Sequence, residues 1–322
     1  MKRRDFISTA IAGATGLLAQ SSPVLAEEPS AKKVSGAIEK VQLGKSGLKV
    51  SRVGMGTGMR GWHRRSNQTR LGDWKFRALL RYCYEQGVNY FDMADLYGSH
   101  QDILPALKGI PRENFVIVSK IWWREGGLPE QERLAADVLV DRFLSEIGTD
   151  YIDLVHLHCV TDADWPEKLA SQMDLLAKAK ENGKIRAHGV SVHALPALEV
   201  AAEHPWVDAV HTRINPFGVK MDGTPEQVVP ILEKMHANGK GVTGMKLIGE
   251  GEFRDDPEKK NQSIRFVLGL KCVDAVIVGF EKPTEFDDFQ NTCRSCPERP
   301  DRNIIKFLLP AETKIAILLL ID

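Results

Sequence analysis

The sequence predicts an α/β protein, a (β/α)8 TIM barrel with an N-terminal β-hairpin. Eight short apolar runs follow Ser51, longer amphipathic segments separate them, and the pattern spans about 250 residues, the usual size of such a barrel. The runs are continuously apolar, as expected for parallel strands buried on both faces. They are Arg52–Met55, Asn89–Ala94, Phe115–Lys120, Ile152–His158, Ala187–Val192, Ala209–Thr212, Gly241–Met245 and Asp274–Val278.

The segments around these runs complete the pattern. Val41–Val50 contains two short apolar stretches separated by a turn signal, which predicts a β-hairpin that would close one end of the barrel. Between the runs, apolar residues recur at spacings of three and four, which is typical of amphipathic helices. Two examples are Trp74–Gln86, followed by Gly87, and Pro166–Asn182, followed by Gly183. Glycine just after a helix suits a left-handed cap.

A doubly wound parallel sheet is the competing architecture. Gly54, Gly56 and Gly58 superficially resemble its phosphate-binding loop, but their spacing is G-x-G-x-G and not G-x-G-x-x-G. The sequence also offers no obvious acidic partner for a ribose. We therefore expect the barrel.

The composition is that of an ordinary globular protein, with 43% hydrophobic and 27% charged residues. Lysine and arginine number 43 and so do aspartate and glutamate, so the chain has no formal net charge. Without a net positive field there is nothing to attract nucleic acid, and we expect no nucleic-acid partner.

The first 26 residues resemble a twin-arginine export signal. Basic Lys2–Arg4 precedes Asp5 and Phe6, a modest apolar stretch follows, and small residues before Glu27 offer a cleavage site. We expect residues 27–36 to be a linker, residues 37–300 the barrel, and residues 301–322 a C-terminal tail. The expected location is the periplasm or outside the cell, with the export machinery as a partner. The apolar stretch is too short for a stable membrane span, although a retained signal anchor is the alternative.

The C-terminal region contains two further features. Lys314–Ile321 is an apolar run, which we interpret as a packed terminal helix or strand. Cys293 and Cys296 form a lone C-x-x-C pair. An iron–sulfur cluster needs four thiolates, so we expect no metal site and interpret the pair as a disulfide or a remnant.

The candidate active site consists of Asp92, Tyr97, Lys120 and His158, which lie at or just after the ends of three consecutive predicted strands. Ligands and chemistry gather at the carboxyl ends of parallel strands. An ammonium from Lys120 would favour the phenolate of Tyr97, Asp92 would hold Lys120, and His158 would orient a substrate oxygen or share its proton. Together they suit the protonation of an oxygen on which negative charge develops.

Each of these four residues also has an ordinary structural interpretation. The aspartate can cap a helix, the tyrosine can pack, the lysine can lie on the surface, and the histidine can be a satisfied core residue. Their joint placement at strand ends favours the functional interpretation.

The motifs that carry these residues resemble those of the aldo-keto reductases. LGKSGLKVSRVGMGTG, GVNYFDMADLYG, VIVSK, DYIDLVHLH and GKIRAHGVS match that family in order, from Val41 to about Phe289. The resemblance implies a (β/α)8 barrel and NADPH-dependent reduction of an aldehyde or ketone. It also implies that Tyr97 is the general acid, assisted by Lys120, Asp92 and His158.

The same resemblance assigns residues to the nicotinamide end of the cofactor. Ser191 corresponds to a serine that contacts the nicotinamide amide, and Val192 stands where the family has an asparagine. His211 aligns with the usual glutamine, and Phe217 lies near the position of an aromatic residue that supports the nicotinamide ring.

The phosphate end of the cofactor departs further from the family pattern. Gly279 and Lys282 lie in the segment that grips the adenosine 2′-phosphate, and Lys246 lies where it can meet a cofactor phosphate or a substrate anion. Glu285 stands where an arginine often binds that phosphate, and its charge would repel it. We expect NADP(H) from the resemblance, with NAD(H) as the alternative.

The expected substrate is a small carbonyl compound. Its pocket would be lined by aromatic residues in the loops after the strands. These are Trp62, His63, Trp122, Trp123 and Trp165. The alternative function is a non-catalytic barrel that binds a ligand or nicotinamide as a sensor or partner subunit. Isomerase or lyase chemistry fits the composition but not the spacing of the four residues.

Overall fold

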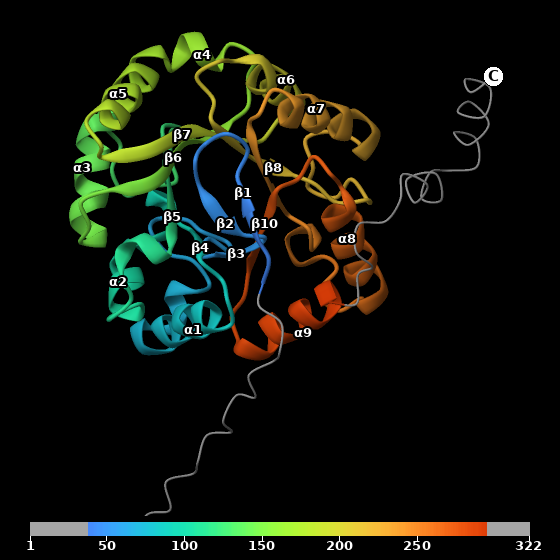
Figure 1. Cartoon of the computed structure of the whole chain (residues 1–322). Coiled ribbons are helices and arrows are strands. Elements are labelled where there is room, and N and C mark those ends of the chain that lie inside the picture. Colours follow the sequence, from blue (N-terminus) through green and yellow to red (C-terminus); the bar gives the residue numbers. More distant parts are fainter. Residues whose placement is uncertain (1–37, 295–322) are drawn as a thin grey trace, which may run out of the picture. The chain divides into compact units, whose positions relative to one another are not determined.

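The computed structural model describes residues 38–294, and within them eight parallel strands close into a barrel (Figure 1). Each barrel strand pairs with the strand before it in sequence, and the last strand pairs with the first, which closes the sheet. The predicted (β/α)8 TIM barrel is therefore confirmed. In order, the strands are β3 (Val53–Gly56), β4 (Tyr90–Asp92), β5 (Val116–Ile121), β6 (Ile152–Val160), β7 (Ile185–Val192), β8 (Ala209–Arg213), β9 (Gly241–Met245) and β10 (Ala275–Gly279).

Helices surround the barrel and cover the outward faces of its strands (Figure 1). The predicted helix after the first strand is present almost as expected. The predicted helix Pro166–Asn182 is interrupted at Leu169, whose backbone leaves the helical region (φ −111°, ψ 14°), so it forms two helices. The described helices are α1 (Asp73–Glu85), α2 (Ile103–Ala106), α3 (Ala136–Ile147), α4 (Trp165–Lys168), α5 (Ala170–Glu181), α6 (Leu195–Glu203), α7 (Pro225–Ala237), α8 (Pro257–Gly269) and α9 (Pro283–Arg294).

The predicted hairpin is formed by β1 (Lys40–Gln42) and β2 (Lys49–Ser51), which lie across the centre of the barrel in Figure 1. Its side chains Leu43, Leu48 and Val50 are fully buried against the apolar residues at the amino-terminal ends of the barrel strands. At Gly44 the backbone has a positive φ of 51°, and a Cβ atom would lie 2.4 Å from the nitrogen of Gly241. Only glycine allows this approach, so the hairpin fits closely over the end of the barrel.

The interior of the barrel changes from apolar to polar toward the carboxyl ends of the strands. Above the apolar layer, the Tyr90 hydroxyl lies 3.0 Å from Nε2 of His211 and 3.1 Å from Oγ1 of Thr243. These residues come from β4, β8 and β9, so the contacts cross the inside of the barrel. A layer of buried polar side chains therefore lies directly beneath the predicted active site.

Several predictions concern residues outside the described part of the chain. They are the export signal at residues 1–26, the linker at 27–36, the tail at 301–322 with its apolar run Lys314–Ile321, and the Cys293–Cys296 pair, whose second cysteine is not described. Within residues 38–294, none of the helices has the length and apolar character needed to span a bilayer.

Candidate active site

The four predicted residues come together at the carboxyl ends of β4, β5 and β6. Asp92 ends β4, Lys120 lies near the end of β5, and His158 lies near the end of β6. Tyr97 ends the short 3-10 turn Asp95–Tyr97 that follows β4. Its hydroxyl lies 3.4 Å from Nε2 of His158, and the Nζ atom of Lys120 lies 5.0 Å from the centroid of its ring. The site therefore brings a phenol, an imidazole and an ion pair into contact.

Lys120 and Asp92 form a buried ion pair. The two residues are only 1% and 6% exposed, and the ammonium also donates a hydrogen bond to the carbonyl oxygen of Met93 at 3.1 Å. Burial raises the pKa of Asp92 and lowers the pKa of Lys120, and the attraction between the two groups opposes both shifts. As the sequence predicted, Asp92 is placed to hold and orient Lys120.

The acidity of Tyr97 differs from the expectation based on sequence. Burial raises its pKa well above the ordinary value, and the negative charge of Asp92 adds to this effect. The ammonium of Lys120 does not overcome this rise in pKa, because it is paired with Asp92 and lies near the ring of Tyr97 instead of at its oxygen. Tyr97 is therefore a fully protonated phenol at neutral pH.

His158 is neutral in this environment. Burial lowers its pKa well below the ordinary value, and the nearby charge of Lys120 lowers it further. Within the described residues its Nδ1 atom has no hydrogen-bond partner. A neutral imidazole has one N–H donor and one acceptor, so His158 can hydrogen-bond a ligand oxygen beside Tyr97.

The segment that carries Tyr97 is held by contacts that the sequence did not reveal. Asp95, two residues earlier, is buried and forms ion pairs with Arg64 at 2.9 Å and Arg142 at 2.6 Å. Gly98, the next residue after Tyr97, has a φ of 67°, and a Cβ atom there would lie 1.9 Å from the carbonyl oxygen of Arg64. The D-L-Y-G segment was visible in the sequence, but no local signal identifies the distant arginines.

The residues predicted to contact the nicotinamide already have partners within the protein. The Ser191 hydroxyl accepts a hydrogen bond from the backbone N–H of Cys159 at 3.0 Å. His211 is 1% exposed, and besides its contact with Tyr90 its Nδ1 atom faces a carboxylate oxygen of Asp92 at 3.5 Å. The resemblance to the family predicts His211 at the cofactor, whereas the structure places it in the polar layer beneath the four candidate catalytic residues.

The predicted phosphate contacts lie on the rim near β9 and β10. Lys246 follows β9 and pairs with Glu250 at 2.8 Å, whereas Lys282 is exposed just before α9. Gly279 ends β10, where a Cβ atom would lie 2.5 Å from the side chain of Met59. These two lysines could bind the phosphates of a dinucleotide, because an ammonium group forms charge-assisted hydrogen bonds to phosphate oxygens.

The first turn of α9 fits a 2′-phosphate less well. A carboxylate oxygen of Glu285 accepts a hydrogen bond from the backbone N–H of Glu281 at 2.7 Å. The negative charge that the sequence predicted near this position is thus fixed at the start of the helix. Phe217, the aromatic candidate for the nicotinamide ring, packs edge-on against Phe253 with ring centroids 4.9 Å apart.

Two of the predicted pocket aromatics form a wall beside the candidate catalytic residues. Trp122 packs edge-on against His158 with ring centroids 5.3 Å apart, and the half-exposed Trp62 packs against Trp122 in turn. His63 stacks on Trp62 at 5.7 Å, and Trp123 packs against the main hydrophobic core. Trp165 is fully buried against His204 and Trp206 in the helical layer, so its assignment to the pocket is wrong.

The sequence missed three residues of this wall. Leu96, Leu128 and Cys159 form an apolar cluster with Trp122, and Tyr97 packs against it. Cys159 directly follows His158 and has a φ of 64°, next to an irregularity in the pairing of β6 with β7. An unusual backbone at one position in a continuous apolar run leaves no trace in the sequence.

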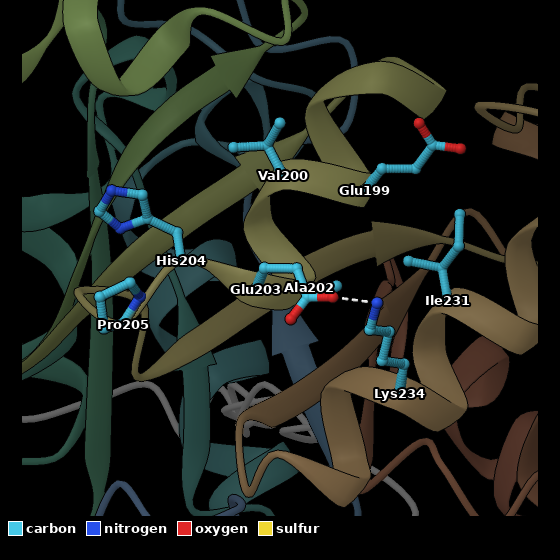
Figure 2. Close-up of a pocket in the computed structure, with 8 residues that line it drawn as sticks. All are labelled: Glu199, Val200, Ala202, Glu203, His204, Pro205, Ile231 and Lys234. Carbon is cyan, nitrogen blue, oxygen red and sulfur yellow. Dashed lines mark ion pairs between the residues drawn. The ribbon is translucent and has the colours of Figure 1, made fainter.

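A separate surface pocket lies away from these residues. Its volume is about 740 Å3, and Figure 2 shows it between α6 and α7, with an ion pair between Glu203 and Lys234 at its edge. Glu203 and Pro205 also line a neighbouring pocket that includes Lys45 of the hairpin turn, so both lie toward the amino-terminal end of the barrel. The described residues include no group of three or more histidine, cysteine or acidic side chains able to hold a metal ion.

Comparison with known proteins gives a consistent result. The model of the aldo/keto reductase family matches residues 52–276. A Glycine max protein named probable aldo-keto reductase 1 is 28% identical over 225 residues, which cover 67% of this chain and 61% of that protein. The L-galactose dehydrogenase of Arabidopsis thaliana is 29% identical over 160 residues, or 48% of each chain. The chain thus aligns with about half to three fifths of these two curated relatives.

The match to solved structures covers more of the compared protein than the sequence matches do. A solved structure of a candidate aldo-keto reductase from Pseudomonas aeruginosa superposes with a TM-score of 0.66 and 25% sequence identity. The match covers 83% of this chain and 99% of the solved one. The similarity therefore extends over the whole barrel and is not confined to the motifs around the four residues.

Proposed function

The chain belongs to the aldo/keto reductase family, and from this premise we propose that it is a NAD(P)H-dependent oxidoreductase that reduces an aldehyde or ketone by hydride transfer. The single observation that supports this most strongly is the contact of Tyr97 with His158 beside the buried Lys120–Asp92 pair. In this mechanism the substrate carbonyl oxygen lies between Tyr97 and His158.

Tyr97 is the general acid. It is protonated at neutral pH because burial raises its pKa, so it has a proton to give when negative charge develops on the substrate oxygen. The positive charge of Lys120, 5.0 Å from the ring, stabilises the phenolate once it forms. Asp92 keeps that charge in place.

His158 positions the substrate oxygen. Because it is neutral, it can donate one hydrogen bond to the carbonyl without competing with Tyr97 for the role of acid. Trp122 and the apolar cluster beside it exclude water from this side of the reacting carbon.

A reduced nicotinamide, when bound, supplies the hydride for the carbonyl carbon. Lys246 and Lys282 would hold its phosphates, and Ser191 lies beside the reacting centre to meet its amide. The resemblance to the family favours NADP(H), whereas the fixed charge of Glu285 opposes a 2′-phosphate. We therefore expect the protein to use NADH at least as well as NADPH.

The function is tested by replacing one oxygen atom. Tyr97→Phe removes the acid and keeps the ring, so we expect kcat for aldehydes to fall by about 100- to 10,000-fold, the usual contribution of general acid catalysis. Thermal unfolding of the variant should match the parent. If Tyr97→Phe retains the activity of the parent, Tyr97 is not the general acid.

A second candidate function is a barrel that binds a ligand or nicotinamide without catalysis. The observation that favours it is the engagement of His211 with Tyr90 and Asp92, together with the buried Val192, which leaves the nicotinamide amide with fewer partners. A parent protein that binds NADH or NADPH but turns over no aldehyde, ketone or quinone would favour this function.

We further propose that the protein is exported in folded form through the twin-arginine route to the periplasm. Lys2–Phe6 and the small residues before Glu27 support this, and the route would carry a bound cofactor with the barrel. Replacing Arg3 and Arg4 by lysine should retain the protein in the cytoplasm, as measured by cell fractionation. Unchanged export of that variant would contradict the proposal.

A further inference from the structure

Arg124 occupies a distinctive place on the rim of the active site. It lies on the loop after β5, two residues beyond Trp122, and its side chain is half-buried. Its guanidinium donates to the Cys159 thiol at 3.5 Å, and Cys159 directly follows His158. Sulfur is a weak acceptor, so this contact satisfies little of the hydrogen-bonding capacity of the guanidinium. Within residues 38–294, Arg124 forms no ion pair with a carboxylate.

The other cations near this site are already paired. Lys120 pairs with Asp92, as described above. Arg213, at the end of β8, pairs with Asp222, and Lys246 pairs with Glu250. Arg124 is different because its charge faces the rim without such a partner. An external anion can therefore bind it without displacing a carboxylate of the protein.

Other cations lie near this rim. His193, whose ring centroid lies 6.4 Å from that of His158, has a pKa of about 3, mainly because of burial, and the positive charges of Arg213, Lys246, Arg124 and Lys120 also lower it. An anion bound at Arg124 would therefore have further positive charge close by.

An apolar cluster connects Arg124 to the candidate catalytic residues. Cys159, which Arg124 touches, belongs to the cluster with Leu96, Trp122 and Leu128, against which Tyr97 packs. A ligand that reaches from Tyr97 to Arg124 would pass this cluster, which favours an apolar or aromatic body.

We propose that the site selects carbonyl compounds that carry a carboxylate, and that Arg124 binds the carboxylate while the carbonyl lies at Tyr97. The planar guanidinium suits this group, because it can form two parallel hydrogen bonds to a carboxylate. This inference rests on the proposed function for the identity of the reacting group, but the binding of the anion does not depend on turnover.

The test compares two aldehydes that differ in charge alone. 4-Carboxybenzaldehyde is anionic at neutral pH, and 4-formylbenzamide has nearly the same shape without charge. Calorimetric titration of the full chain, saturated with oxidised nucleotide so that no reduction occurs, should show that the acid binds about 10- to 100-fold more tightly. Kinetics with NADH or NADPH should show a similar ratio in kcat/KM.

Arg124→Gln and Arg124→Met should abolish the preference for the acid and leave the affinity for the amide within about threefold. The matched control is Arg81→Gln, which removes a partly exposed arginine of α1 that pairs with Glu85. It should keep the preference intact.

The outcomes separate this inference from the proposed function. If the parent binds the acid no more tightly than the amide, or binds neither, the inference is overturned. Equal turnover of both aldehydes would overturn it while leaving the reductase function standing. Selective binding of the acid that Arg124→Gln abolishes, without turnover of any carbonyl compound, would support the anion site and contradict the reductase.

Discussion

The carboxylate of Glu285 accepts a hydrogen bond from the backbone N–H of Glu281 at 2.7 Å, so α9 begins with a negative charge held in place by the chain itself. Acidic groups at a helix N-terminus are stabilised by the backbone amides there, which makes this an ordered charge. By resemblance to the family, this is where a 2′-phosphate would lie. We therefore expect the charge of Glu285 to influence the choice of cofactor.

Glu285→Gln keeps the hydrogen bond and removes the charge. We expect the ratio of kcat/KM for NADPH over NADH to rise about 5- to 10-fold, because the interaction of two solvent-exposed charges, screened by salt, is worth up to about 1 kcal/mol. The control is Asp288→Asn, which removes an exposed charge one turn later in α9. If both variants change the ratio equally, the effect of Glu285 is only a general change of surface charge.

The buried ion pair of Lys120 and Asp92 should behave as a unit in folding. Lys120→Met leaves Asp92 buried without its partner, and we expect the free energy of unfolding to fall by about 3–5 kcal/mol. The double variant with Asp92→Asn should be less destabilised than the sum of the single variants by about 2 kcal/mol. Urea unfolding measures all three, and additive effects would show that the pair contributes no coupling.

His156 should make the stability of the protein depend on pH. It lies inside the barrel, neither of its ring nitrogens has a hydrogen-bond partner within the described residues, and burial lowers its pKa well below the ordinary value. As the pH falls through about 6.5, the unfolded chain takes up a proton at this residue and the folded chain does not. The folded state therefore loses up to about 1.4 kcal/mol per pH unit below that value for each such histidine.

His156→Met tests this dependence by urea unfolding between about pH 5 and pH 7.5. The slope of stability against pH should decrease by about one proton, and stability near pH 7.5 should be unchanged or higher because the unsatisfied nitrogens are gone. An unchanged slope for His156→Met would contradict the prediction.

Gly98 should resist any side chain because of its neighbour Arg64. Its φ of 67° disfavours other residues, and a Cβ atom would lie 1.9 Å from the Arg64 carbonyl oxygen. We expect Gly98→Ala to lower the free energy of unfolding by about 2–4 kcal/mol from backbone strain and overpacking. It should also reduce kcat, since Tyr97 is the preceding residue.

Gly148→Ala is the matched control for this prediction. Gly148 has the same left-handed backbone as Gly98 (φ 84°, ψ 39°), but a Cβ atom there would make only an ordinary contact, 3.7 Å from the side chain of Leu104. Its cost should be the backbone strain alone, about 1–2 kcal/mol. Equal losses of stability for the two variants would show that relieving the close contact with the Arg64 carbonyl oxygen costs no free energy.

The features that the sequence predicted well are local ones. Continuous apolar runs located all eight barrel strands to within about two residues, and the polar residues at their ends located Asp92, Lys120 and His158 because the carboxyl ends of parallel strands share one face. The break at Leu169 was missed, since the apolar spacing continues through it and only the backbone angles change.

The features that were missed depend on which strands face each other across the barrel. His211 was aligned to a cofactor-binding position, but its partners Tyr90 and Asp92 come from the opposite wall, more than 100 residues earlier in the chain. The two arginines that hold Asp95 are likewise distant in sequence. The acidity of Tyr97 was mispredicted for a related reason: the charge of Lys120 is already paired, and burial has the larger effect.

The hairpin that lies across the barrel also determines how protons can move. Because Leu43, Leu48 and Val50 seal one end, the interior chain of Tyr90, His211 and Thr243 stops above an apolar floor and offers no exit to solvent there. In the proposed mechanism, a proton that Tyr97 gives to a substrate would therefore be replaced from the open end of the barrel. The alcohol product would leave by that same end, so the two events would share one passage.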